Sequence, residues 1–186
     1  MKRFLMFLLI VIGVFLLFVA TRPAAFRVER SASVSAPPPA VYAQLADFHQ
    51  WPAWSPWEHI DPAMTKSLSG AESGTGAVYE WNGNDKVGQG RMTITDAEPD
   101  RRVAIKLEFM KPFQATNVTT FDLVPSSDGT RVTWAMEGRN NFVAKAMCIF
   151  MPMDKMVGGD FEKGLASLKQ VAERSGAAPA DSSASH

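Results

Sequence analysis

The sequence predicts an α+β protein in which a curved antiparallel sheet wraps around a long C-terminal helix, preceded by one transmembrane helix. Three observations support this fold class. Residues 4–20 form an uncharged apolar run. From residue 65 to Gly138, apolar side chains recur at every second position, which is typical of strands with one buried face. After Gly138 the spacing becomes helical, which is typical of a helix that buries one stripe.

The N-terminal apolar run is long enough to cross a membrane. A helix over residues 4–20 extends about 25 Å, close to the roughly 30 Å of a bilayer's hydrocarbon core. The flanking side chains of Lys2, Arg3 and Arg22 can extend to the head groups. Most residues of the run are Leu, Ile, Phe or Val, each favouring insertion by roughly 0.3 to 0.6 kcal/mol. We therefore interpret residues 1–25 as an N-terminal transmembrane anchor or signal-like segment.

A cleaved signal peptide is the alternative to a retained anchor. Cleavage requires a small residue both directly before the cut and three positions before it. A cut after Ala20 places Phe18 at the earlier position, and a cut after Ala24 places Arg22 there. We therefore favour a retained, single-pass anchor.

The charges that flank the apolar run predict its orientation. Lys2, Arg3 and the amino terminus are expected to stay in the cytoplasm, which places the domain on the extracytoplasmic side of the membrane. Arg22, Arg27 and Arg30 follow the run and argue for the opposite orientation.

The rest of the chain divides into one domain and a tail. Residues 26–174 are enough to bury the core of one ordinary domain. Residues 175–186 are small and polar and are expected to be disordered. The formal net charge is zero and no region is strongly basic, which argues against a nucleic-acid partner. Cys148 is the single cysteine, which excludes an intrachain disulfide, and its apolar helical surroundings predict a buried thiol.

The domain begins with a strand and a short helix. The alternating segment "FRVERSASVS" predicts a strand over residues 26–35. Prolines are tolerated at the start of a helix, and Val41, Leu45 and Phe48 fall on one face of the segment that follows. We therefore expect a helix over residues 38–48.

Five strands are expected to follow as antiparallel hairpins. "NGND" and the Ser-Asp-Gly turn are hairpin signals. The clearest strand is "RRVAIKLEFMKPF", in which Lys106 and Glu108 face outward. Such a sheet is apolar on one side and solvated on the other. Its predicted inner face includes Ala77, Tyr79, Trp81, Met92, Ile94, Val103, Ile105, Leu107, Phe109, Val132, Trp134 and Met136.

The C-terminal part of the domain is expected to be helical. "FVAKAMCIFM" predicts a separate helical piece that ends near Pro152. In the terminal helix, apolar residues lie near i, i+4 spacing at Val157, Phe161, Leu165, Leu168 and Val171. A helix with a single apolar stripe must pack on the large apolar surface available, which is the concave face of the sheet.

The segment "DFHQWPAWSPWEHIDPAM" places three of the five tryptophans of the chain within seven residues. Its prolines prevent a long regular element. Two interpretations are open for Trp51, Trp54 and Trp57. They form an aromatic lid at the mouth of a cavity, or they close the core as structural residues, with each indole N–H bonded to a partner. We favour closure, which still allows Trp54 to line a pocket.

His49, Glu58, His59 and Asp61 surround these tryptophans. Imidazoles and carboxylates are groups that bind zinc or transfer protons. The spacing of these four residues fits no metal-site signature, and the segment is expected to be solvated. We therefore predict surface or capping roles for them, and no metal or cofactor.

The segment "SAPPPAVYAQLADFHQWPAWSPW" resembles the first third of SRPBCC-superfamily domains, which include polyketide cyclase/dehydrase-like and START-like lipid-binding proteins. "GTGAVYEWNGNDKVGQGRMTI", "VTWAMEG" and "DFEKGLASLK" resemble the middle hairpin, the last strand and the terminal helix of that group. The expected order of elements is also that of its helix-grip (START-like) fold. The resemblance implies a cavity between sheet and helix that takes hydrophobic small molecules or lipids. It implies no universal catalytic motif.

The predicted cavity wall follows from the strand alternation. Asn117 and Thr119 share a face with Phe121, which makes them the main polar groups that point inward. A mostly apolar pocket with a few polar groups is typical of a small-molecule site. Periodicity alone is also typical of side chains that fill a core. The predicted ligand-binding residues are Trp54, Tyr79, Trp81, Met92, Ile105, Leu107, Phe109, Asn117, Thr119, Phe121, Trp134, Met136, Met153, Val157 and Phe161.

These features favour a non-enzymatic, membrane-tethered domain that holds a hydrophobic small molecule or lipid between the sheet and the C-terminal helix. An enzyme of the polyketide cyclase/dehydrase type is the second hypothesis. It needs an acid or base with a shifted pKa in the pocket, and none is predicted to point inward from the strands. A ligand-free scaffold for another envelope protein is the third, which an exposed apolar patch would favour. The ligand and the oligomeric state stay open.

Overall fold

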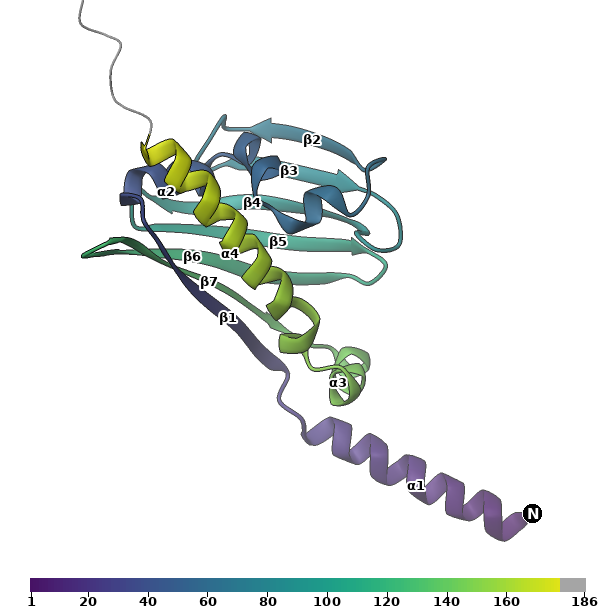
Figure 1. The fold of residues 1–186 in the computed structure, drawn as a ribbon. Coiled ribbons are helices and arrows are strands. Elements are labelled where there is room, and N and C mark those ends of the chain that lie inside the picture. Colours follow the sequence, from purple (N-terminus) through teal and green to yellow (C-terminus); the bar gives the residue numbers. More distant parts are fainter. Residues whose placement is uncertain (178–186) are drawn as a thin grey trace, which may run out of the picture.

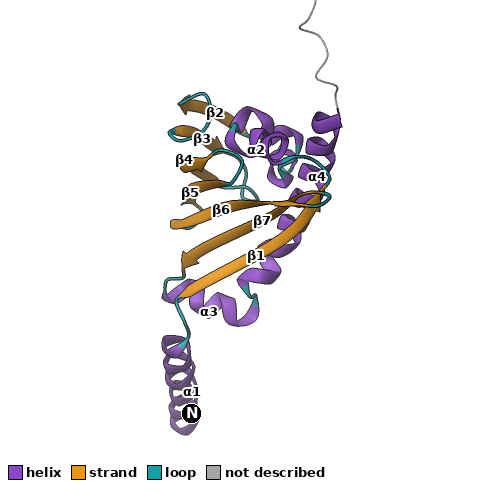
Figure 2. Cartoon of the chain, turned by 90° about the vertical axis from the view of Figure 1, so that its left-hand side faces the viewer, coloured by secondary structure: helices purple, strands orange, loops and turns teal. Residues whose placement is uncertain are grey.

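The computed structural model describes residues 1–177 and has the α+β architecture that the sequence predicts (Figure 1). One curved antiparallel sheet of seven strands forms the first layer, and helices on its concave face form the second (Figure 2). The N-terminal helix projects away from both layers. The predicted helix-grip arrangement, a sheet wrapped around the terminal helix, is therefore confirmed.

The sheet joins the beginning of the domain to its end. The strand order is β1-β7-β6-β5-β4-β3-β2, so the first strand pairs with the last one and the others follow as hairpins. Every neighbouring pair is antiparallel. The strands are β1 (Ala25–Val34), β2 (Thr65–Gly70), β3 (Ala77–Asn82), β4 (Gln89–Glu98), β5 (Arg102–Lys111), β6 (Ala115–Ser126) and β7 (Gly129–Arg139).

The predicted alternation is present in the inner strands, but it does not identify the edge strand. Val103 and Ile105 of β5 are fully buried, whereas Lys106, which follows Ile105, is exposed. In β2 all six side chains are exposed, so no apolar period marks it. β2 forms through its backbone pairing with β3, with Leu68 opposite Tyr79. A strand without a buried face leaves no periodic signal in the sequence.

The helices lie where the periodicity predicts them. α2 begins with two prolines, and α4 crosses the concave face of the sheet (Figure 1). α4 buries one stripe, which includes Phe161, Leu165 and Leu168. The helical elements are α1 (Lys2–Thr21), α2 (Pro38–Ala46), η1 (Phe48–Ala53), η2 (Pro56–His59), α3 (Phe142–Phe150) and α4 (Met153–Ala177).

A charged contact orients α4 on the edge strand β1. The Arg30 guanidinium donates to Asp154 at 2.8 Å and to Glu162 at 2.7 Å. These two hydrogen bonds raise the pKa of Arg30, and the bond from Arg30 lowers the pKa of Asp154. Both carboxylates are largely exposed, so the contact fixes the direction of the helix more than it stabilises the fold.

The tryptophan segment packs into the core. It forms the short helices η1 and η2, because Pro52 and Pro56 interrupt a longer one. Trp51 and Trp54 are almost fully buried. Their indole N–H groups donate to backbone carbonyl oxygens of α2, at 3.2 Å and 3.1 Å respectively. This geometry agrees with structural closure, and Trp57 is half-buried beside them.

The expectation that Glu58 and Asp61 are solvated is wrong. Both residues are buried, because hydrogen bonds engage their carboxylates. Glu58 accepts from the Tyr79 hydroxyl at 2.6 Å and lies 2.5 Å from the Lys66 ammonium. Asp61 accepts from the backbone N–H of Asn84 at 2.7 Å. Burial, together with the Glu58 carboxylate, raises the pKa of Tyr79. The two acids therefore fasten the tryptophan segment to β2, β3 and the turn after β3.

Helices form both ends of the described part of the chain. α4 continues to Ala177, so the first residues of the expected tail, 175–177, are helical, and residues 178–186 lie outside the described part of the chain. In α1 the single buried residue is Val19. α1 has the length and apolar composition of a membrane-spanning helix, which a signal sequence shares.

We predict that Trp54→Ala lowers the free energy of unfolding by about 3 to 5 kcal/mol, the usual cost of removing a buried aromatic side chain. Trp54 packs edge-on against Phe121 and Trp134, with ring centroids 6.0 Å and 5.8 Å away, so alanine leaves a cavity among the rings. Urea unfolding of the full chain in a mild detergent measures the change. His59→Ala, at an exposed position of the same segment, is the control. It should change the free energy of unfolding by less than about 0.5 kcal/mol. An equal loss of unfolding free energy in both variants would contradict the role of Trp54 in core packing.

Tyr79→Phe should destabilise the protein by about 1 to 3 kcal/mol, because the buried Glu58 carboxylate loses a donor. The effect should depend on pH. The pKa of Tyr79 is raised in the folded protein, whereas an unperturbed tyrosine in the unfolded chain titrates near pH 10. As the pH rises, the unfolded chain therefore loses the hydroxyl proton of Tyr79 first. Wild type therefore loses this contribution above about pH 10, and its advantage over Tyr79→Phe shrinks. A constant difference between about pH 7 and pH 11 in urea unfolding would refute the assignment.

Candidate functional site

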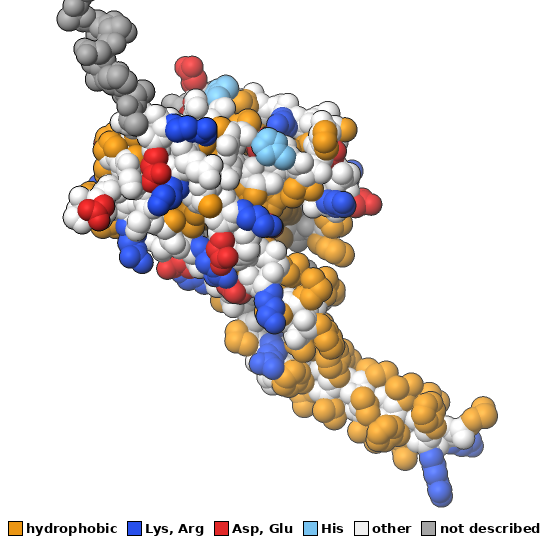
Figure 3. Space-filling view, in the orientation of Figure 1, with side chains coloured by type: hydrophobic (Ala, Val, Ile, Leu, Met, Phe, Trp, Pro, Cys, Tyr) orange, Lys and Arg blue, Asp and Glu red, His pale blue; other side chains and the backbone are white. Residues whose placement is uncertain are grey.

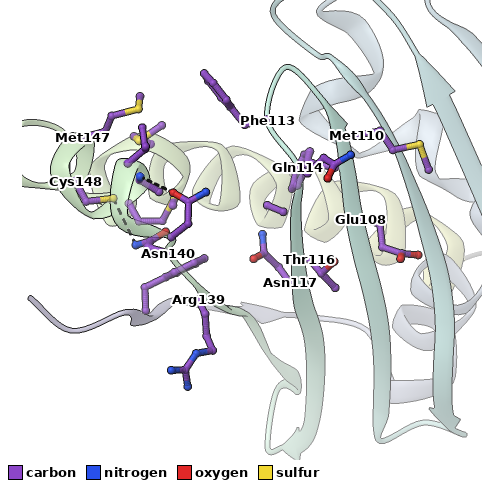
Figure 4. Close-up of a pocket in the computed structure, with 18 residues that line it drawn as sticks. Glu108, Met110, Phe113, Gln114, Thr116, Asn117, Arg139, Asn140, Met147 and Cys148 are labelled. Carbon is purple, nitrogen blue, oxygen red and sulfur yellow. Dashed lines mark hydrogen bonds between the residues drawn. The ribbon is translucent and has the colours of Figure 1, made fainter. Parts of the chain in front are cut away.

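A pocket lies at the end of the sheet where β1 begins, β5 turns into β6 and β7 ends (Figure 4). Its volume is about 600 Å³, and it is open on one side. Phe26, Phe109 and Asn117 line it from the sheet, and Met147 and Met153 line it from α3 and the start of α4. The pocket therefore lies between the end of the sheet and the two C-terminal helices.

Apolar and flexible side chains dominate the lining. Four of the lining residues are methionines: Met110, Met147, Met153 and Met156. Phe113, in the turn between β5 and β6, also lines the pocket (Figure 4). The methionine thioether is unbranched and polarizable, so it adapts to partners of different shape. This lining suits an apolar ligand without fixing its exact outline.

Asn117 is a buried polar group in this apolar wall. Among the described residues, its amide nitrogen has one weak acceptor, the Met136 sulfur at 3.8 Å. The amide fits because its neighbour on β7 is Gly138, where a Cβ would lie 2.1 Å from the Asn117 Oδ1 and would also touch the Phe26 ring. An amide in an apolar wall that has one weak bond remains able to bond a polar group of a ligand.

Hydrogen bonds hold α3 beside the pocket. Asn141 caps its first turn by accepting from the N–H of Ala144 at 2.8 Å. The Asn140 amide donates to the Cys148 sulfur at 3.6 Å (Figure 4). Cys148 is half-buried and lines the pocket, so the expectation of a fully buried thiol is wrong. The reason is that α3 packs on the pocket and not on the core.

α3 also contacts the end of α1. The Lys145 ammonium donates to the carbonyl oxygens of Ala20 and Arg22, both at 3.0 Å. Carbonyl groups at the C-terminal end of a helix lack intrahelical partners and accept such bonds readily. The Phe150 ring lies 6.3 Å from the Phe15 ring. One wall of the pocket is therefore joined directly to the candidate membrane span.

Two charged side chains border the pocket. Glu108, which is expected on the outer face, pairs there with Lys106 at 2.7 Å and reaches the pocket at the edge of β5. Arg139, at the end of β7, extends away from the space between the sheet and α3 (Figure 4). Glu108 is the one carboxylate among the described lining residues, and it is partly exposed.

The predicted ligand-binding residues divide into three groups. Phe109, Asn117 and Met153 line the pocket. Three more are half-buried against the core: Met92, Leu107 and Val157. The other nine are buried inside the domain: Trp54, Tyr79, Trp81, Ile105, Thr119, Phe121, Trp134, Met136 and Phe161. Ligand contact by the second and third groups stays a prediction, and it would require the packed core to open.

Apart from Met153, sequence reasoning missed the helical side of the pocket. Val143 and Met147 of α3 and Met156 of α4 line it. In α3 only Lys145 interrupts an apolar segment, so periodicity does not show which apolar side chains face the pocket. Phe113 was missed because a turn residue has no strand alternation. The informative signal is structural: none of the residues of α3 is buried, although most are apolar.

The remaining candidate residues lie away from the pocket. His49 is exposed, and its ring bonds the Asp47 carboxylate at 2.7 Å. His59 is also exposed. Glu58 is held by Tyr79 in the contact described above. Across residues 1–177, no three His, Cys, Asp or Glu side chains gather in a way that could hold a metal ion.

Solved structures share the fold of this chain at low sequence identity. A Staphylococcus aureus protein of unknown function has a TM-score of 0.60 at 14% identity, over 83% of this chain and 97% of that one. A Chromobacterium violaceum protein has a TM-score of 0.53 at 19% identity, over 81% and 99%. The Aha1 dimer from Colwellia psychrerythraea has a TM-score of 0.55 at 16% identity, over 80% and 96%. A search of curated proteins found no match.

A family model extends the comparison from fold to family. It matches residues 25–173, from the first residue of β1 to near the end of α4, and its description is "Polyketide cyclase / dehydrase and lipid transport". The match includes the whole sheet and the pocket at its end. This result agrees with the sequence resemblance to SRPBCC-superfamily domains, which include polyketide cyclase/dehydrase-like proteins. The chain therefore belongs to the polyketide cyclase / dehydrase and lipid transport family.

Proposed function

We propose that this protein is a membrane-tethered domain that binds a hydrophobic small molecule or lipid in the pocket at the end of the sheet. The observation that carries the proposal is the pocket itself, an open space of about 600 Å³ lined by apolar side chains and one buried amide. Sites for small molecules commonly have volumes of about 300 to 1,000 Å³ and this kind of lining. The family's description, which includes lipid transport, supports the same ligand class.

The proposed position differs from the middle of the domain, where the sequence places it. Trp134 and Phe161 stack with their ring centroids 4.2 Å apart, so aromatic side chains occupy the space between sheet and helix. We therefore assign ligand contact first to Phe109, Asn117 and Met153, the predicted residues that line this pocket. The Asn117 amide would bond a carbonyl or hydroxyl group of the ligand.

The tether in this proposal is α1. Its length and composition suit a membrane span, and its C-terminal end is bonded to the pocket wall through Lys145. Hydrophobic ligands partition into bilayers, so a pocket held there meets a high local concentration of them. We place the domain on the extracytoplasmic side, because Lys2 and Arg3 precede the span.

The full chain, extracted from host membranes in mild detergent, should carry a nearly stoichiometric hydrophobic adduct. Native mass spectrometry should detect the adduct, and denaturing conditions should release it and give its mass. Ala144→Trp would fill the pocket from α3 and should lower occupancy about tenfold or more, equivalent to at least about 1.4 kcal/mol of binding energy. The matched control is Val124→Trp, at an exposed position of β6 outside the pocket, which should keep wild-type occupancy.

Two results would count against this assignment. An adduct that Ala144→Trp retains would place the ligand elsewhere in the domain. A bare wild-type protein would contradict stable carriage and would favour the cyclase-type enzyme or the ligand-free scaffold. Asn117→Leu separates these last two hypotheses, since a transient substrate would need the buried amide and a solid scaffold would not.

The proposed orientation makes a separate prediction. In a bacterial host, alkaline phosphatase fused after His186 should be active, because its disulfides form outside the cytoplasm. A fluorescent reporter that matures only in the cytoplasm should stay dark at the same position. The reverse pair of results would invert the topology, and it would leave the pocket assignment unaffected.

A further inference from the structure

The domain leaves an apolar surface uncovered around the mouth of the pocket. Phe150 is 75% exposed and Phe113 is 67% exposed, and other large apolar side chains of α3 are exposed beside them. A folded domain rarely exposes so many neighbouring apolar side chains unless they contact a partner or a membrane. We define this surface, the apolar rim, as Phe113, Phe142, Val143, Met147, Phe150 and Met151.

We propose that the apolar rim inserts into the surface of the bilayer that α1 enters, so that the pocket opens toward lipid. This inference rests on the proposed function in one respect, the membrane-spanning role of α1. It adds a second membrane contact, made by the domain itself. The occupant of the rim is then the acyl and head-group region of the lipid leaflet next to the domain.

The contact between α3 and α1 sets the depth of the rim. Phe15 lies six residues before Thr21, the last residue of α1, which is about 9 Å along a helix. The Phe150 ring lies beside the Phe15 ring. If α1 spans the bilayer, Phe150 must therefore lie below the membrane surface with it. Helices that lie in a membrane surface bury their apolar face by about 5 to 10 Å, which matches this depth.

The charges around the rim suit a membrane surface. Among the described residues, Arg22, Lys111 and Arg139 have no acidic partner within ion-pair distance. The acids nearby are already neutralised, since Glu108 pairs with Lys106 and Asp154 pairs with Arg30. An unpaired basic border attracts the anionic head groups of lipids.

Continuity with α1 favours a bilayer over a protein as the occupant. Figure 3 shows apolar side chains running from α1 onto the adjoining end of the domain, with basic side chains at the junction. Lys145 fixes α3 to the end of α1 through two hydrogen bonds. A protein partner would have to cover the rim while competing with the lipid that surrounds α1.

Depth-dependent fluorescence quenching in vesicles tests the proposal. The full chain with Cys148→Ser receives one cysteine at a time, as Phe150→Cys or Phe113→Cys, labelled with the environment-sensitive dye NBD. Vesicles contain phosphatidylcholine and phosphatidylglycerol, with or without nitroxide-labelled lipid. Phe15→Cys is the reference inside α1, and Val124→Cys is the exposed control on β6. We expect quenching at both rim positions of at least half that at Phe15→Cys, with a blue-shifted emission, and none at Val124→Cys.

The outcomes separate the rim from the anchor. Quenching at Phe15→Cys with none at Phe150→Cys or Phe113→Cys would overturn the insertion of the rim and leave the anchor intact. Quenching at the rim without quenching at Phe15→Cys would support insertion and overturn the membrane span. Rim labels that escape both the nitroxide lipid and a water-soluble quencher would show that a protein covers the rim, which also overturns the proposal.

Discussion

The stacking of Trp134 on Phe161 is the contact on which the rest of the structure depends. The rings lie 4.2 Å apart and almost parallel, and they join the last strand to the terminal helix. Phe121 and Trp54 pack against Trp134 from other directions. Aromatic side chains of this size bury much apolar area, so the space between the sheet and α4 is a stable, filled core. A binding space in this chain can then form only where the aromatic cluster ends.

The end of the sheet differs from the core in both composition and partners. Beyond Phe109 and Met136 the lining includes methionines, asparagines and small residues beside Phe26 and Phe113. α3 forms one wall of this space, and Lys145 bonds it to the end of α1. This arrangement links the proposed ligand site to the proposed membrane anchor through one short helix.

Periodicity predicted the inner strands of the sheet, the terminal helix α4 and the inward direction of Asn117, because each depends on which face of an element is apolar. The uncharged apolar run, and not a period, predicted α1. Periodicity could not reveal Glu58, whose burial depends on a hydrogen bond from Tyr79, 21 positions away in sequence. It could not assign a packing face to α3, which is apolar except for Lys145 and has no buried residue. It also could not decide between a cavity and a core, since a side chain such as Phe121 faces inward in either case. Whether the interior is filled depends on the volumes of contacting residues.

The order of apolar and polar groups, from the mouth of the pocket inward, gives a physical reason for placing the mouth beside a membrane. Phe113 lies in the turn at the mouth, and Asn117 lies further along β6, away from that turn. If the rim rests in the leaflet, the buried Asn117 amide lies on the side of the domain, and Met147 of the rim lies toward the acyl chains. A lipid in that leaflet already points its polar end toward the domain and its apolar end into the bilayer. It could enter polar end first, bond Asn117 and keep its chain against α3 without turning over. A ligand dissolved in water would have no such preferred direction, so the polarity of the pocket favours uptake from the bilayer.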